Sequence, residues 1–378
     1  MKVVLAGSAL PGIRAAQTTR IAATAWEQMR PSDEIASWVV SDGISMPLVG
    51  SGLDDVWATA QSRVEERGSV DTRHFALRTG NDVLLDYTTL LAGVPAEGSP
   101  SSALVGHDLL WAVDSGVTHA ILALPVPGSI DDMGCGLLAS LAGMQTHLLG
   151  SHSSQESELP AVPELATALA QAKERLGGLR ITLLAPSEQR LLGLSGVARS
   201  WMQRGIEPAV AQAAERRFGE LASRVIEASA HTRRTSLLAD ELTSRGIYAG
   251  IGGGLGFMFE ALGASIFPVG DLTVRDRLTP DISNADLVVY ICGAINDDLP
   301  SGLISALDQA KKVGVPVVVV YDSGALRKGE LPSLGLNGAY ELRPDFAFEP
   351  PEAIDEFGRL QPILFDMMTR VARTWGWD

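Results

Sequence analysis

The feature that most constrains the fold is a pair of strand-length apolar runs in the last third of the chain. Residues 285–292 read ADLVVYIC, and residues 315–321 read VPVVVVY. Runs so rich in apolar β-branched residues are typical of parallel strands that are covered on both faces. Residues 302–313, which lie between them, have apolar side chains at helical spacing. The sequence therefore predicts a β-α-β unit of a parallel sheet in this part of the chain.

The N-terminal end of the chain shows the same alternation of strand and helix patterns, which we call its α/β texture. Residues 2–6 and 35–40 read as strands, and residues 13–30 and 54–67 read as helices. Residues 74–87 differ, because two short alternating strands flank a turn that contains Gly and Asn, which is typical of a hairpin. The middle of the chain therefore lacks the regular alternation that both ends share.

This change of texture predicts two α/β domains. One is a discontinuous, flavodoxin- or Rossmann-like domain with a doubly wound parallel sheet, formed by residues 1–71 and 251–378. The other is an inserted mixed α/β domain formed by residues 72–250. Ligands of such folds bind at the carboxyl ends of strands and between domains, so we expect the functional residues there.

Composition excludes several classes of function. The formal charge of −15 and the aromatic content of 6% argue against a nucleic-acid or anionic-membrane partner. No apolar run reaches the roughly 18 residues of a membrane-spanning helix, and the first residues do not form a secretory signal. Cys135 and Cys292 are the only cysteines, which favours a reducing, cytoplasmic location.

A turn at residues 127–136 follows a third apolar run and precedes a small-residue helix. A strand, a glycine-containing turn and a helix start together often bind anions, because the first helical N–H groups lack backbone partners. Asp131 and Asp132 lie in this turn and could hold the Mg²⁺ that accompanies a nucleotide. The alternative is that one of them caps the helix.

Residues 250–256, GIGGGLG, form the most glycine-rich segment and allow three interpretations. Their backbone amides could cradle a triphosphate. They could instead mark close packing, where only glycine fits. A dinucleotide-binding turn with Asp271 as the ribose acid is the third interpretation, but no proper strand precedes the segment.

Three aspartates directly follow predicted strands, namely Asp42, Asp297 and Asp322. Site residues of α/β folds lie at such positions. Strand ends also collect ordinary turn aspartates, so the position alone does not distinguish the two roles.

The order of these motifs resembles that of the type I glycerate kinases over nearly the whole chain. The strongest match is residues 249–264, AGIGGGLGFMFEALGA, which is similar to the family's glycine-rich segment in spacing and in the helix that follows. Residues 109–144 resemble the family's helix, strand and second glycine-containing turn. Weaker matches cover residues 39–43, 84–93, 203–205 and 288–297.

The departures from the family pattern fall mostly on charged positions. Ser8 and Pro11 stand where the family has an Asp and a Lys, and Pro186 and Ala294 replace an Asp and a Glu. Arg204, by contrast, occupies the position of a family Lys. What survives is mostly glycine, which builds the backbone, and what is lost is mostly charge, on which phosphoryl transfer depends.

The resemblance implies phosphorylation of glycerate or a related small hydroxy acid, with ATP and Mg²⁺ as cofactors. MgATP would lie between residues 250–256 and 128–136. Asp132 and Asp42 are the expected catalytic residues, and Asp131 and Asp132 are the expected metal ligands. Arg204, Asp86 and Asp297 are expected to contact the substrate. The expected cofactor-binding residues are Gly128, Ser129, Gly134, Gly250, Gly252, Gly253, Gly254 and Gly256.

The lost charges favour an alternative, a catalytically impaired kinase paralogue that binds a small molecule or regulates a partner. Both hypotheses imply a small-molecule ligand and no nucleic-acid or membrane partner. Both hypotheses are compatible with a homodimer.

Overall fold

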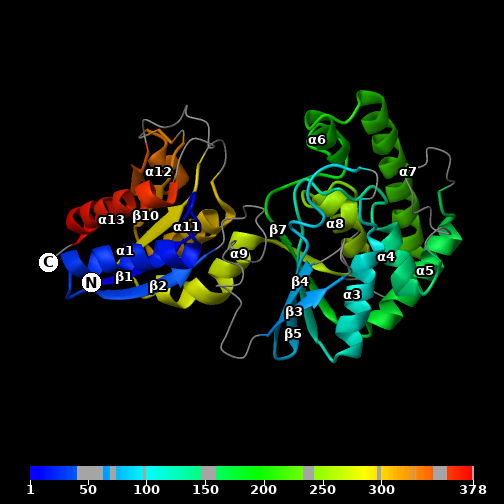
Figure 1. Ribbon diagram of the computed structural model, residues 1–378, viewed down its shortest axis with the longest axis horizontal. Helices are drawn as coiled ribbons and strands as arrows, with labels where there is room; N and C mark the ends of the chain where they lie inside the picture. Colours follow the sequence, from blue (N-terminus) through cyan, green and yellow to red (C-terminus); the bar gives the residue numbers. More distant parts are fainter. Residues whose placement is uncertain are drawn as a thin grey trace. The chain divides into compact units, whose positions relative to one another are not determined.

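The computed structural model describes residues 1–40, 63–68, 74–96, 99–145, 159–232, 242–295, 299–324, 326–327, 329–343 and 356–376. The chain divides into two compact units. The first unit comprises Met1–Ala58 and Pro268–Asp378, and the second unit comprises Thr59–Phe267. Figure 1 labels their helices and strands.

The first unit contains a five-stranded parallel sheet with the order β11-β10-β9-β1-β2. Numbered along the chain, this order is 2-1-3-4-5, which is the flavodoxin-like order. The strands are β1 (Lys2–Gly7), β2 (Glu34–Val39), β9 (Leu287–Cys292), β10 (Val317–Tyr321) and β11 (Gly338–Glu341).

Helices cover both faces of this sheet, as the buried strand sequences predict. On one face, Val3 and Leu5 pack with α1 (Ala15–Met29) and α13 (Glu356–Trp375), which lie side by side in Figure 1. On the other face, Val4 and Ala6 pack with residues of α11 and of the segment from 274 to 282. Helix α11 spans Ser301–Val313, and α9 (Val269–Thr273) and α10 (Thr279–Ile282) flank a short π-helix, Val274–Leu278. A short helix, α12 (Leu331–Leu334), precedes β11.

The second unit contains a six-stranded mixed sheet with the order β3-β4-β5-β6-β7-β8. Pairs β3–β4 and β4–β5 are antiparallel, whereas β5–β6 and β6–β7 are parallel. The strands are β3 (Arg63–Arg67), β4 (His74–Thr79), β5 (Asp82–Asp86), β6 (His119–Ala123), β7 (Arg180–Ala185) and β8 (Ser265–Pro268). The helices are α3 (Ala103–Asp114), α4 (Cys135–Ala142), α5 (Val162–Leu176), α6 (Val197–Gln203), α7 (Pro208–Thr232) and α8 (Ile251–Leu262).

The two α/β folds, one parallel and one mixed, confirm the predicted fold class. The hairpin predicted within residues 74–87 is β4–β5. The helix predicted over residues 54–67 is wrong at its C-terminal end, where Arg63–Arg67 forms strand β3. This segment pairs with β4 along its whole length, and that pairing overrides its local helical pattern.

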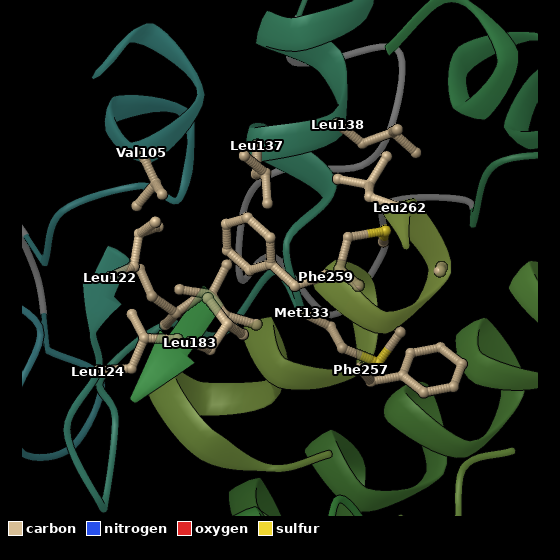
Figure 2. Close-up of a cluster of buried hydrophobic side chains, with 14 of the residues drawn as sticks. Val105, Leu122, Leu124, Met133, Leu137, Leu138, Leu183, Phe257, Phe259 and Leu262 are labelled. Carbon is tan, nitrogen blue, oxygen red and sulfur yellow. The ribbon is translucent and has the colours of Figure 1, made fainter. Parts of the chain in front are cut away.

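The division of the chain differs from the predicted boundaries at residues 59–71 and 251–267, which both lie in the second unit. For residues 251–267 the core packing explains the difference. Figure 2 shows the reason, since Phe259 of α8 points toward Leu122 of β6 and Leu183 of β7. Phe257 and Leu262 of α8 belong to the same buried cluster. Strand β8 then completes the second sheet. The sequence texture showed α/β alternation here, but it did not show which of the two sheets the segment joins.

Candidate functional site

Four segments of the second unit meet at the carboxyl ends of its parallel strands β5, β6 and β7. The loop after β5 bonds the loop after β6, since the N–H of Ser129 donates to the Leu91 carbonyl oxygen at 2.7 Å. The glycine segment, residues 250–256, bonds the loop after β6 and the loop after β7. Gly252 N–H donates to the Pro125 oxygen at 2.9 Å, and Gly250 N–H donates to the Gln189 oxygen at 2.8 Å. This edge is where ligands bind in α/β sheets, and we treat it as the candidate site.

The two predicted glycine segments lie in direct contact. A Cβ atom on Gly128 would lie 2.1 Å from the carbonyl carbon of Gly252, and one on Gly253 would lie 2.2 Å from the Ile130 oxygen. Gly134 likewise faces the Met258 side chain, at 2.8 Å from such a Cβ. The two segments therefore pack against each other at these points, and the expectation that ATP lies between them stays a prediction.

The backbone amides of the glycine segment are engaged within the protein. Gly253 and Gly254 both donate to the Gly250 oxygen at 3.1 Å, and Gly252 and Gly250 donate to the loops named above. Gly252, Gly253 and Gly254 have φ of 63°, 78° and 98°, a left-handed conformation that favours glycine. All residues from Gly250 to Gly256 are buried. These are the contacts of close packing, and a phosphate-binding role for Gly250, Gly252, Gly253, Gly254 and Gly256 stays a prediction.

Asp132 caps helix α4. Its Oδ1 accepts the N–H of Gly134 at 2.8 Å, and its Oδ2 accepts the Ser102 hydroxyl at 2.9 Å and the N–H of Gly136 at 3.3 Å. The residue is 4% exposed. Burial raises the pKa of Asp132, although the hydrogen bonds from Ser102, Gly134 and Gly136 act in the opposite direction. A catalytic or metal-binding role for Asp132 stays a prediction beside this cap.

Substitution Asp132→Asn tests the cap. Both carboxylate oxygens of Asp132 accept hydrogen bonds, and the NH2 group of asparagine cannot accept one. At least one buried donor would therefore lose its acceptor. We expect the free energy of unfolding to fall by about 1–3 kcal/mol. Urea unfolding measures the loss, and Asp114→Asn, at the last residue of α3, is the control. Equal stability of the Asp132 and Asp114 variants would contradict the capping role.

The other predicted site residues of the second unit lie near this edge, each in a different environment. Asp131 is half-buried beside the cap. Asp86 ends β5, and its Oδ1 accepts the Thr88 N–H at 2.9 Å and the Thr88 hydroxyl at 2.5 Å. Ser129 is buried, and its hydroxyl donates to the Leu91 oxygen at 3.1 Å. Arg204 follows α6 with an exposed side chain.

Asp42 and Asp297 lie outside the described residues. Asp322, the third aspartate that follows a predicted strand, forms a buried ion pair in the first unit. Arg343 Nε donates to its Oδ1 at 2.6 Å, and Arg343 Nη2 bonds its Oδ2. Asp271, considered above as a ribose acid, accepts the Ser305 hydroxyl at 2.6 Å in the first unit, while the glycine segment lies in the second. A dinucleotide-binding unit would need both in one β-α-β unit, so the structure contradicts that interpretation.

Within the ranges that the structure describes, no three His, Cys, Asp or Glu side chains converge as a metal cluster. Mg²⁺ that arrives with a nucleotide is commonly held by one or two carboxylates together with phosphate oxygens and water. Asp131 and Asp132 therefore fit such an ion in residue type, although the Asp132 oxygens already accept hydrogen bonds.

Sequence reasoning missed a buried polar network around Asp108 of α3. Its Oδ2 lies 2.6 Å from His74 Nε2 and accepts the Tyr87 hydroxyl at 2.8 Å, while its Oδ1 pairs with Arg67 at 3.1 Å. The Arg67 guanidinium also stacks on the Trp111 ring at 4.0 Å. The four polar residues come from β3, β4, the end of β5 and α3, so no local spacing pointed to the network.

Among the described residues, no helix is long and apolar enough to cross a membrane. This finding agrees with the hydropathy of the sequence.

Comparisons with known proteins identify the family. The model of the glycerate kinase family matches residues 11–375 of the chain. A crystal structure from Salmonella typhimurium LT2, of a protein provisionally named glycerate kinase 2, aligns with 99% of this chain and 98% of its own. The TM-score is 0.71 and the sequence identity 18%, so this likeness shows the fold alone. The comparison with curated proteins found no match. Because the family model covers nearly the whole sequence, the chain belongs to the glycerate kinase family.

Proposed function

We propose that this protein transfers a phosphoryl group from ATP to a hydroxyl group of glycerate or a related small hydroxy acid. The observation that carries the proposal is the family match over residues 11–375. The meeting of four segments at the carboxyl edge of the second sheet supports it, because this edge brings Asp86, Asp131 and Asp132 to one end of the unit. The cytoplasmic location and the homodimer stay predictions.

We propose that Asp131 holds Mg²⁺ with ATP and that Asp132, as the helix cap, orients the turn that carries it. The ion would neutralise phosphate charge. Arg204 would bind the substrate carboxylate, since a guanidinium pairs well with two carboxylate oxygens. Asp86 would contact the substrate, and Asp42 and Asp297 keep the catalytic and substrate roles that the resemblance implies.

A specific observation favours a second candidate, a catalytically impaired paralogue that binds a small molecule. Both oxygens of Asp132 already accept hydrogen bonds. Carbonyl oxygens likewise accept hydrogen bonds from backbone N–H groups of the glycine segment, namely those of Gly250, Gly252, Gly253 and Gly254. A site with these groups engaged would bind a ligand through fewer polar contacts.

An ATP-coupled assay with D-glycerate separates the two candidates. Turnover that saturates with glycerate and requires Mg²⁺ would support the kinase. Calorimetric binding of ATP, ADP or glycerate without turnover, beside an active family member as positive control, would support the impaired paralogue. Absence of both binding and turnover would reject both proposals.

Substitution Asp131→Asn tests the proposed metal role. The variant would hold Mg²⁺ less well, and loss of one group that stabilises the transition-state charge typically costs about 100-fold or more in kcat, by analogy with single oxyanion donors. We expect a loss of this size in the coupled assay, with a fold that urea unfolding shows to be intact. Asp114→Asn, the same change at the end of α3, should keep the wild-type rate. An Asp131 variant as active as this control would remove Asp131 from the site.

A further inference from the structure

Trp201 of α6 joins two segments that lie far apart in the sequence. Its indole Nε1 donates to the Gly128 carbonyl oxygen at 2.9 Å, and the residue is 2% exposed. Gly128 belongs to the turn that holds Asp131 and Asp132. The indole N–H is the only polar group of this side chain, so the whole hydrogen-bonding capacity of the tryptophan side chain is used on this turn.

The main-chain carbonyl of Trp201 holds the chain reversal that follows α6. It accepts the N–H of Arg204 at 3.0 Å and the N–H of Ile206 at 3.1 Å. Gly205, between them, has a φ of 97°, which allows the chain to reverse. Arg204 is therefore fixed by the same residue that bonds Gly128.

Contacts on either side keep α6 in place around Trp201. The Phe218 ring of α7 packs edge-on against the indole, with ring centroids 5.7 Å apart. Gln189 Nε2 donates to the Ser200 hydroxyl at 3.0 Å. A helix of seven residues is too short to be stable by itself, so its placement depends on such contacts. Among them, the indole bond is the one that reaches the turn at Gly128.

We propose that Trp201 is a positioning residue, which holds Arg204 in a fixed place relative to the turn at Gly128. The inference rests on the proposed function insofar as Arg204 binds the substrate carboxylate. The Arg204 side chain is exposed, and no hydrogen bond or ion pair joins it to a described residue. Its capacity to bind the substrate carboxylate therefore depends on where its backbone is held.

Substitution Trp201→Phe removes the N–H and keeps an aromatic ring for Phe218. The matched control is Trp26→Phe in the first unit, because Trp26 is also fully buried and its Nε1 donates to Asp33 Oδ2 at 3.0 Å. Hydrogen exchange with mass spectrometry is read on peptides that cover residues 125–131 and 200–206. We expect faster exchange in both segments for Trp201→Phe and in neither for Trp26→Phe. Wild-type exchange in either segment of the Trp201 variant would overturn the proposal.

Kinetics give a second readout, which a purely structural role would not move. We expect Trp201→Phe to raise KM for D-glycerate about 10-fold, with kcat within about threefold of wild type. Arg204→Ala in the Trp201→Phe background should add less than it does alone, because a displaced arginine has already lost its contact. Effects that multiply independently would overturn the proposal. If the wild type neither binds nor phosphorylates glycerate, the proposed function fails, and the exchange experiment still decides whether Trp201 ties the two segments.

Discussion

Substitution of Gly253 by alanine is expected to destabilise the second unit by about 3–5 kcal/mol. The added methyl group would lie 2.2 Å from the Ile130 carbonyl oxygen, a backbone atom that cannot rotate away. The residue also has a φ of 78°, which costs an L-residue roughly 1–2 kcal/mol. Thermal and urea unfolding would measure the loss, and reduced soluble yield is an expected companion effect.

Gly263→Ala is the matched control for this experiment. Gly263 follows the same helix, α8, and has a φ of 93°, but its added methyl group would meet no described residue within 4 Å beyond its chain neighbours. The control therefore carries the conformational cost alone, about 1–2 kcal/mol. If the two variants lost equal stability, the contact between the two glycine segments would not be a packing constraint.

Substitution Asp108→Asn is expected to cost about 3–5 kcal/mol, because it leaves the Arg67 guanidinium without its buried counter-charge. His74 and Tyr87 would lose their shared acceptor as well. Glu220→Gln, which breaks the exposed pair of Glu220 with Arg224 on α7, should change stability by less than about 1 kcal/mol. Similar losses in the two variants would show that the buried network contributes no more than a surface ion pair.

The Asp108 network also predicts how stability depends on pH. Burial by itself would raise the pKa of Asp108, but hydrogen bonds and charges from His74, Tyr87 and Arg67 bring the pKa below its usual value. In the window between the lowered and the usual pKa, the unfolded state binds more protons than the native state. The stabilisation is therefore complete above the usual pKa and is lost as pH falls through the lowered one. The stability difference between wild type and Asp108→Asn should shrink in acid.

The parts of the fold that could be read from the sequence rest on local patterns. The runs at residues 285–292 and 315–321 became β9 and β10, which helices cover on both faces. The hairpin within residues 74–87 rests on a turn that its own residues specify. Strand β3 was missed, because its membership in the sheet comes from pairing with β4 and not from its own pattern.

The candidate site could be predicted only in part. Sequence motifs identified both glycine segments, and the structure places them against each other. The hydrogen-bond partners of the glycine N–H groups and of the Asp132 oxygens could not be predicted, because these partners lie in segments that are distant along the chain. Ser102, for example, reaches Asp132 from the start of α3, thirty residues earlier.

The amino-acid sequence by itself determined the α/β class, the buried parallel strands and the two segments where the backbone needs glycine. Local patterns of apolar residues and of glycine are enough to predict these features. Only the tertiary structure decided which sheet α8 joins, that the two glycine segments pack together, and that Asp108 meets His74 and Arg67. The physical reason is that close packing and buried hydrogen bonds are satisfied between elements, and their partners exist only once the chain has folded.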